Sequence, residues 1–417
     1  MIRQKQKALK SDKLQQSFKW SELLLPLSVF WTAICFGLIL SLSRHCAGSA
    51  TLFDSGHYMG SSIALYESIK AVIGDPARLL VECRSLKDNL LLDGPVMPLL
   101  GCIPYWLSGS KPDLFHMQPV LVFMVFLHGL TAVGVFFLSR IMTANQRCAF
   151  AGGMLWALYP AALISTTKFL TEPVSCVLGV ATVLLSYHSL RMTARPGVLF
   201  LLHLCLGLAL SVFLMVRPII APGALIVCLM PLFFAKERAR ILKIGLVAFL
   251  VGASLVILPW LFYTKAASDK FYVFPQRQPI YNLFRGFNIE SDGRETPLAP
   301  SAFDEMTRSQ ALALIVDRVV EQPGAFGAMA LRKLPRLWCS PWNDYRFKIL
   351  GLPIVSQCWW HSILVAFGCL GLVLFLRGLS VPRSAIEPSA IEPSAIKPSD
   401  LLALRFVGIA SIWLILA

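Results

Sequence analysis

Long uninterrupted apolar runs, rather than alternating or heptad patterns, dominate the chain. A helix of about 20 apolar residues can cross the hydrocarbon core of a bilayer, because it satisfies all its own backbone hydrogen bonds there. Nine runs of this kind are separated by polar segments, at residues 23–42, 115–139, 148–166, 173–190, 198–216, 218–235, 244–264, 358–376 and 401–417. We therefore expect an all-α polytopic membrane protein with about nine spans.

A shorter apolar run at residues 95–109, interrupted by three prolines, decides which loops share a side. If it lies in the membrane interface, the short loops on one side hold nearly all the basic residues that flank spans. The opposing short loops then hold only Lys168 and Arg217. Because basic residues mark the cytoplasmic ends of spans, this asymmetry favours the interfacial reading and a cytoplasmic N-terminus. The two long loops, 43–94 and 265–357, then share the non-cytoplasmic side.

The first 22 residues form a basic arm. A signal peptide also begins with basic residues, but no small-x-small cleavage motif follows the first apolar run, so a retained first helix is expected. Residues 23–264 form the transmembrane core that this helix begins.

The segments after the core differ in pattern. Residues 265–357 show helical spacing at 303–320 and 324–337, which predicts a small, mainly helical outer domain. The C-terminal part, 358–417, holds two spans and a linker at 378–400 with a five-residue repeat, SAIEPSAIEPSAIKPS. Proline at every fifth position prevents a helix, so the linker is expected to be extended or disordered. The last apolar run stops without a polar tail, as a truncated span would.

Composition supports the membrane class and excludes one partner class. The chain is 56% hydrophobic and only 15% charged, and its mean hydropathy is +0.66. Its formal charge of +15 is of the size seen in nucleic-acid-binding proteins. Much of this positive charge lies in short segments beside the spans, where it sets the orientation of the spans across the membrane. We therefore expect membrane lipids, and no nucleic acid, as partners.

The first outer loop opens with an acidic residue, Asp54, at the boundary between water and membrane. There it is suited to act as a general base, because partial burial raises a carboxyl pKa toward a useful range. It is equally suited to cap the helix predicted to follow. His57, one helical turn on, makes a weak candidate metal pair with Asp54. Two ligands are too few for a metal site, and the alternative is a surface histidine.

Other charged residues at the outer side also have two readings. Asp93 is a second pocket acid or a turn residue in Asp-Gly-Pro. Glu172 contacts a substrate hydroxyl, or complements the dipole of the helix that it begins. Arg217 holds a phosphate, or extends to lipid headgroups. Arg285 and Lys333 in the large loop are further phosphate partners, or part of a solvated basic face.

Several motifs follow one another in order from about residue 20 to 376. They are the first-loop Asp54, the proline-rich run, Tyr159-Pro160, Thr171-Glu172-Pro173, Leu258-Pro259-Trp260, the stretch from Asn282 to Asn288, Gln322-Pro323-Gly324, and the stretch from Arg332 to Pro341. This order resembles the GT-C glycosyltransferase superfamily, and within it the bacterial branch related to protein O-mannosyltransferases and lipid A aminoarabinose transferases. The resemblance implies a GT-C-like helix bundle in the inner or plasma membrane.

The resemblance also implies chemistry. The donor would be a sugar on a polyprenyl phosphate, transferred on the outer face to an envelope glycan, lipid or protein. Asp54 matches the family's first-loop acid, and Asp93 lies where a second acid or a histidine is often found. Asn288, in Gly286-x-Asn288, and Lys333, before Trp-x-x-Pro, match recurring large-loop positions. No cofactor is implied with certainty, and a divalent metal remains open.

Two departures and two rival functions accompany the resemblance. Ser55 stands where many members carry a second acid, and Phe262-Tyr263-Thr264-Lys265 stands where many carry an Arg-Asn pair.

A transporter or flippase of a lipid-linked or small substrate would show paired repeats with broken helices, and no internal repeat is evident. A non-catalytic, decayed transferase stays open because the second acid is missing.

Overall fold

The computed structural model describes residues 20–42, 54–114, 116–143, 145–191, 196–218, 224–229, 238–275, 289, 308–339, 362 and 366. Within these ranges every regular element is a helix and there is no strand. Most of the basic arm, the linker at 378–400, the last predicted span and nearly all of the one before it lie outside these ranges, so those predictions are untested.

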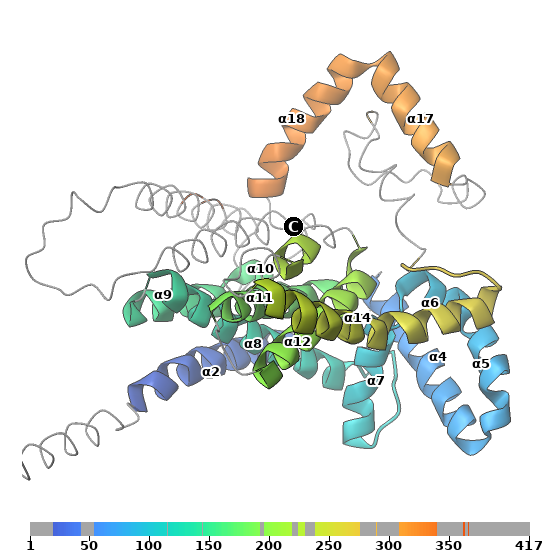
Figure 1. Ribbon diagram of the computed structural model, residues 1–417, viewed down its shortest axis with the longest axis horizontal. Coiled ribbons are helices and arrows are strands. Elements are labelled where there is room, and N and C mark those ends of the chain that lie inside the picture. Colours follow the sequence, from blue (N-terminus) through green and yellow to red (C-terminus); the bar gives the residue numbers. More distant parts are fainter. Residues whose placement is uncertain are drawn as a thin grey trace, which may run out of the picture.

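Five helices are long and apolar enough to cross a membrane. They are α2 (Trp20–Leu42), α8 (Gln118–Thr143), α11 (Thr171–Arg191), α12 (Pro196–Val216) and α14 (Arg238–Ser268). In Figure 1 they run side by side along the long axis of the molecule. The prediction of a helical, multi-pass membrane protein is confirmed at this level, whereas nine spans remain a prediction.

The predicted span at 148–166 is wrong as a single helix. The chain instead forms α9 (Gln146–Ala157) and α10 (Pro160–Ser165), separated by Tyr159 in an extended conformation with φ −66° and ψ 117°. The break has a simple cause, because Pro160 lacks an N–H and its ring pushes the preceding residue out of the helical region. Asn145 caps the start of α9, where its side chain accepts a hydrogen bond from the Arg147 amide at 2.8 Å.

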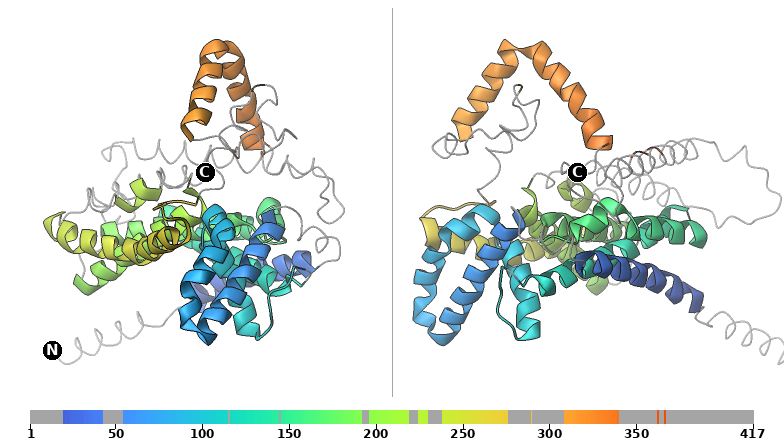
Figure 2. Two further views of the ribbon diagram at one scale, coloured as in Figure 1. Left: turned by 90° about the vertical axis from the view of Figure 1, so that its right-hand side faces the viewer. Right: turned by 180° about the vertical axis from the view of Figure 1, so that it is seen from behind.

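Five helical segments of the first loop run across one end of the bundle (Figures 1 and 2). They are α4 (Asp54–Gly74), the 3-10 turn η1 (Pro76–Arg78), α5 (Leu79–Ser85), α6 (Lys87–Asp93) and α7 (Val96–Ser108). At 13 residues, α7, which was predicted to be interfacial, is shorter than any of the five candidate spans. It lies against α4, where Gly101 leaves room for Ser62 and the Cys102 thiol donates to the Ser62 carbonyl at 3.2 Å.

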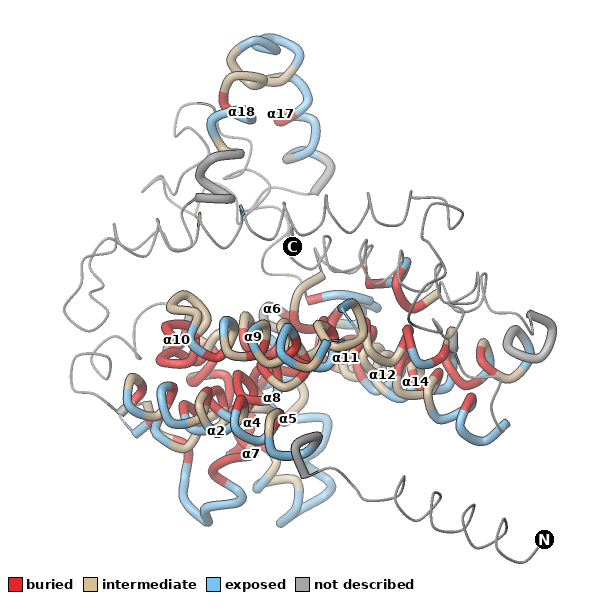
Figure 3. Tube along the Cα trace, turned by 90° about the vertical axis from the view of Figure 1, so that its left-hand side faces the viewer, coloured by how far each residue is buried: buried red, intermediate tan, exposed pale blue. Residues whose placement is uncertain are grey.

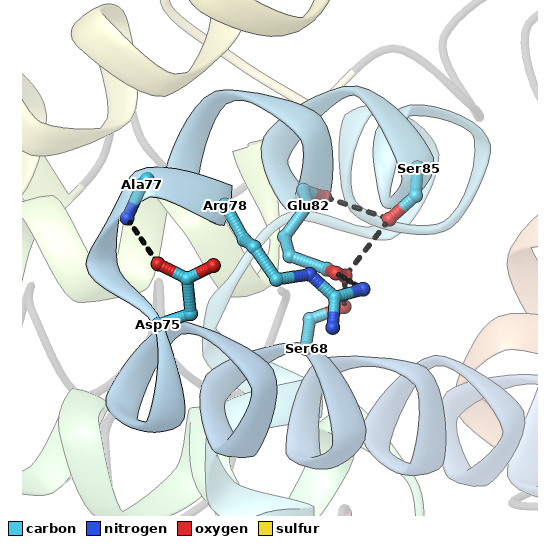
Figure 4. A network of polar contacts seen from close by, with 6 residues as sticks. All are labelled: Ser68, Asp75, Ala77, Arg78, Glu82 and Ser85. Carbon is cyan, nitrogen blue, oxygen red and sulfur yellow. Dashed lines mark hydrogen bonds and ion pairs between the residues drawn. The ribbon is translucent and has the colours of Figure 1, made fainter.

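The turn from α4 into α5 is fixed by one carboxylate, Glu82, as Figure 4 shows. Its Oε1 accepts from Arg78 Nη2 at 2.8 Å, and its Oε2 accepts from Ser68 Oγ at 2.9 Å. Asp75 caps η1 by accepting from the Ala77 amide at 3.1 Å. These bonds hold the hairpin of α4 and α5 closed where it extends past the bundle.

Small residues let the spanning helices approach closely, as is common in membrane bundles. A Cβ at Gly207 of α12 would collide with the carbonyl oxygen of Phe249 in α14, and one at Gly252 would collide with the carbonyl oxygen of Leu204. α12 and α14 therefore touch backbone to backbone. Figure 3 shows buried residues where helices face one another, and exposed residues on the outer faces that lipid would cover.

The large loop contributes two described helices, α17 (Arg308–Glu321) and α18 (Pro323–Cys339). They occupy the two segments where the sequence showed helical spacing, so these helices are confirmed. α17 and α18 pack against each other, and in Figures 1 and 2 they stand apart from the spanning helices.

Candidate functional site

Both long loops meet at one end of the bundle, which we call the loop end and define by Gly94, Thr166, Met215 and Pro275. Ser41 Oγ, at the end of α2, donates to the Thr166 carbonyl at 3.2 Å. Gly94 follows α6 with φ +76°, and a Cβ there would lie 2.7 Å from Pro275 Cγ and 2.8 Å from the Met215 carbonyl oxygen. Only glycine fits this position, since it combines a positive φ with close packing. The first loop thus contacts both the second loop and the end of α12.

An ion pair joins two predicted site residues at this end. Arg217 Nη2 donates to Glu172 Oε1 at 2.7 Å, linking the first turn of α11 to the residue that follows α12. The side chains are 35% and 38% exposed, respectively, so the pair is half-buried. In the described part of the structure the second carboxylate oxygen, Oε2, is buried and has no hydrogen-bond partner. The sequence identified each residue separately, and the structure brings them together across 45 positions.

Aromatic residues line the same end. Trp260 is 2% exposed and stacks on Tyr263, with ring centroids 5.5 Å apart and planes 24° apart. Phe169 meets Tyr58 edge to face at 6.1 Å. Trp260, Phe169 and Tyr58 belong to one apolar cluster with Met215, Val216 and Val174, the neighbours of the ion pair. Sequence reasoning assigned these aromatic residues no role, although Trp260 belongs to a motif that it noted.

The start of α4 is linked by one ring contact to the chain just before Glu172. Tyr58, which contacts Phe169, is one turn beyond Asp54, the first residue of α4. Ser55 is completely buried, and among the described residues its hydroxyl has no hydrogen-bond partner. Asp93 is the last residue of α6 and directly precedes Gly94. The backbone of Asp93 therefore lies at the loop end, and Asp54 begins α4 one turn before Tyr58. The side chains of both acids lie outside the described set.

The structure shows less of the remaining candidates. Lys333 lies on α18, apart from the bundle, where partial burial lowers the pKa of its amine. Arg285 and Asn288 lie outside the described residues, so their roles stay predictions. His57 is half-buried on α4. In the part of the chain that the structure describes, no three His, Cys, Asp or Glu residues gather as a metal site would require.

The loop end combines groups that suit a polar ligand at a membrane surface. Arg217 has further N–H donors beyond the one given to Glu172, and a guanidinium binds phosphate oxygens well. The second oxygen of Glu172 is able to accept a hydrogen bond from a hydroxyl. Trp260 and Tyr263 pack in the apolar cluster that also contains Val174 and Val216, which are close in sequence to the two charged residues. A phosphorylated, hydroxyl-rich molecule with an apolar part matches this set.

The sequence matches no protein-family model, and no curated protein and no solved structure matches it. The functional argument therefore rests on the residues of this chain.

Proposed function

We propose that the chain is a membrane glycosyltransferase, which moves a sugar from a polyprenyl-phosphate donor to a lipid, glycan or protein acceptor. Transfer would take place on the non-cytoplasmic face of the cell membrane, with the N-terminus cytoplasmic. The observation that carries the proposal is the Glu172–Arg217 pair, because it lies where both long loops meet and where the chain turns from apolar spans to polar loops.

The position of the pair suits a lipid-linked donor. A polyprenyl chain stays among the lipid tails while its phosphate and sugar lie at the membrane surface. The loop end combines these environments, since the spans below it are apolar and the helices α4 and α7 run across it. Such a donor is already activated, because a polyprenyl phosphate is a good leaving group, so the reaction needs no nucleotide.

The reaction then needs a base for the acceptor hydroxyl and a cation for the departing phosphate. Asp54 is our candidate base, since α4 begins with it beside the aromatic cluster. Arg217 is our candidate cation, because its guanidinium is held at the loop end by Glu172. Glu172 and Asp93 would contact sugar or acceptor hydroxyls.

The large loop would complete the site. We assign Asn288 and Lys333 to binding of the sugar and phosphate, as the family resemblance implies, and Arg285 to the phosphate because of its charge. A divalent metal at Asp54 and His57 would assist the same phosphate if the missing ligands came from the substrate.

The testing experiment supplies reconstituted protein with a polyprenyl-phosphate sugar labelled in the sugar, together with membrane lipids and envelope glycan. The expected product is label covalently attached to an acceptor, with free polyprenyl phosphate formed in equal amount. Arg217→Gln should slow formation of both products. Label that crosses the membrane on an intact donor would identify a transporter instead and overturn the proposal.

A further inference from the structure

One face of α11 is polar along the whole helix. Residues at alternating spacings of three and four face the same way, because an α-helix turns by about 100° per residue. The face comprises Glu172, Ser175, Gly179, Thr182, Ser186 and Ser189. From the first to the last it extends about 26 Å, close to the roughly 30 Å thickness of a bilayer core. We call it the α11 polar face.

Three of the four hydroxyls on this face lack hydrogen bonds in the described structure. In the described structure Ser175, Thr182 and Ser186 have hydroxyl oxygens without a partner, and so does Ser211 of the neighbouring α12. These residues are 6%, 3%, 0% and 0% exposed, respectively. Each of the four side chains is thus more than nine-tenths buried with an unsatisfied polar atom.

Hydroxyls elsewhere in the same protein behave differently. Ser62 donates to the Tyr58 carbonyl at 2.8 Å, Thr131 to the Leu127 carbonyl at 2.9 Å, and Ser268 to the Thr264 carbonyl at 2.7 Å. This bond to the carbonyl four residues back is the usual way for a helical hydroxyl to be satisfied in an apolar environment. In the described structure Ser55 of α4 also lacks a partner, but three unsatisfied hydroxyls fall on the single face of α11.

The polar face is directed into the bundle, away from lipid. On one side of it α11 packs against α12, through Leu178 and Leu185. On the other side Val183 packs against Val227, in the helical turn at residues 224–229. The hydroxyls lie between these two contacts and point into the seam between α12 and that turn.

Both ends of the seam are marked by paired polar groups. At the loop end is the Glu172–Arg217 pair. At the other end His203 of α12, completely buried, lies 3.2 Å from Ser189 Oγ through Nε2, while its Nδ1 lies 3.0 Å from the Leu199 carbonyl oxygen. Between these ends the hydroxyls are neutral, and Gly179 interrupts their row without adding a side chain.

We infer that the α11 polar face binds a file of buried water molecules, which begins at the Glu172–Arg217 pair and extends toward His203. A buried hydroxyl without a hydrogen bond is costly, and three along one face of α11 call for a ligand that both donates and accepts. Water is the smallest molecule that does so, and buried water commonly satisfies such groups. A bare cation fits less well, because neutral hydroxyls alone supply no compensating charge. The inference stands independently of the proposed transferase.

The test introduces single cysteines at Thr182 and at Ser186 in the full-length protein, reconstituted in lipid. A hydrated thiol ionises and reacts with a small methanethiosulfonate, whereas a thiol in a dry apolar contact does not. The matched control is Val183→Cys, because Val183 is adjacent and 1% exposed, within an apolar cluster. Intact mass counts the added labels over the background of the 11 native cysteines.

We expect Thr182→Cys and Ser186→Cys to react at least tenfold faster than Val183→Cys. Reaction of all three at the same slow rate would show a dry seam and overturn the inference. Reaction of all three at the same fast rate would show general opening of the bundle, which also overturns it.

A second measurement covers cysteine variants that fail to fold. Thr182→Val and Ser186→Ala remove the hydroxyls and keep the side chains small. If the hydroxyls anchor water, the unfolding temperature falls, since each removal leaves a water with one partner fewer. A rise in unfolding temperature would mean that the hydroxyls are dry and unpaired, contrary to the inference.

Discussion

The contact between α12 and α14 permits a quantitative prediction. Gly207 lies against the backbone of Phe249 and Ala253, and Gly252 lies against the backbone of Leu204. We predict that Gly207→Ala destabilises the bundle, because the new methyl group would overlap a carbonyl oxygen of the facing helix. A side chain in that place could rotate aside, but a carbonyl held in a helix cannot.

The expected magnitude follows from two opposing effects. Replacing a helical glycine by alanine stabilises a helix by roughly 1 kcal/mol. Overpacking a closely packed contact costs about 1–3 kcal/mol, and the upper end applies where backbone meets backbone. The net loss is therefore about 2 kcal/mol. At roughly 2 °C per kcal/mol for a chain of this size, the unfolding temperature should fall on the order of 4 °C.

The assay is thermal unfolding in detergent, followed by a thiol-reactive dye. Cys228 reports directly on this region, because it is completely buried in the cluster that joins α12 to Phe249. The matched control is Gly197→Ala in the same helix, where a Cβ would meet no described atom within 4 Å. Gly207→Ala unfolding at the same temperature as Gly197→Ala would refute the backbone contact.

Three further predictions concern polar contacts. A double-mutant cycle on Glu172→Gln and Arg217→Gln should give a coupling of about 1 kcal/mol in unfolding free energy, reduced by the solvent that reaches both side chains; zero coupling would show that the pair is not formed. Glu82→Ala should lower stability by about 2 kcal/mol and speed proteolysis of the hairpin of α4 and α5, because it removes bonds to two helices; unchanged proteolysis would contradict this. Asn145→Ala should cost about 1 kcal/mol, whereas Asn145→Asp should cost little, since aspartate also caps; equal unfolding temperatures for the two variants would show that the cap contributes nothing.

The sequence predicted most of the described helices because membrane spans follow from local properties. A run such as 173–190 needs only length and hydropathy to be recognised, and α11 extends just beyond it. The break within the run 148–166 also has a local cause. Pro160 was visible in the sequence, but uniform hydropathy on both sides concealed its effect.

Contacts between distant helices were not predictable in this way. Glu172 and Arg217 each appeared as charges at the edge of a span, and nothing in the sequence paired them. Gly207 and Gly252 looked like any other glycines of a membrane helix. The backbone-to-backbone contact depends on how the two helices cross, which hydropathy does not encode.

The candidate site is predicted in part. The structure brings Glu172, Arg217 and the backbone of Asp93 to the loop end, and Asp54 begins α4 one turn before Tyr58, which contacts Phe169. Lys333 lies on a separate pair of helices, so its role in binding the donor stays a prediction.

The most direct test of the proposed transferase is the turnover of Asp54→Asn with a polyprenyl-phosphate sugar in reconstituted membranes. We predict that this variant folds, shows an unchanged unfolding temperature and loses at least 99% of its transfer rate, because general-base catalysis contributes roughly 10²–10⁴-fold. Asp75→Asn is the control, since Asp75 is an exposed cap of the same loop, and asparagine caps equally well. Transfer by Asp54→Asn at the rate of Asp75→Asn would contradict the assignment of Asp54 as the base. Absence of any sugar transfer by the unsubstituted protein, with every proposed class of acceptor supplied, would contradict the transferase itself.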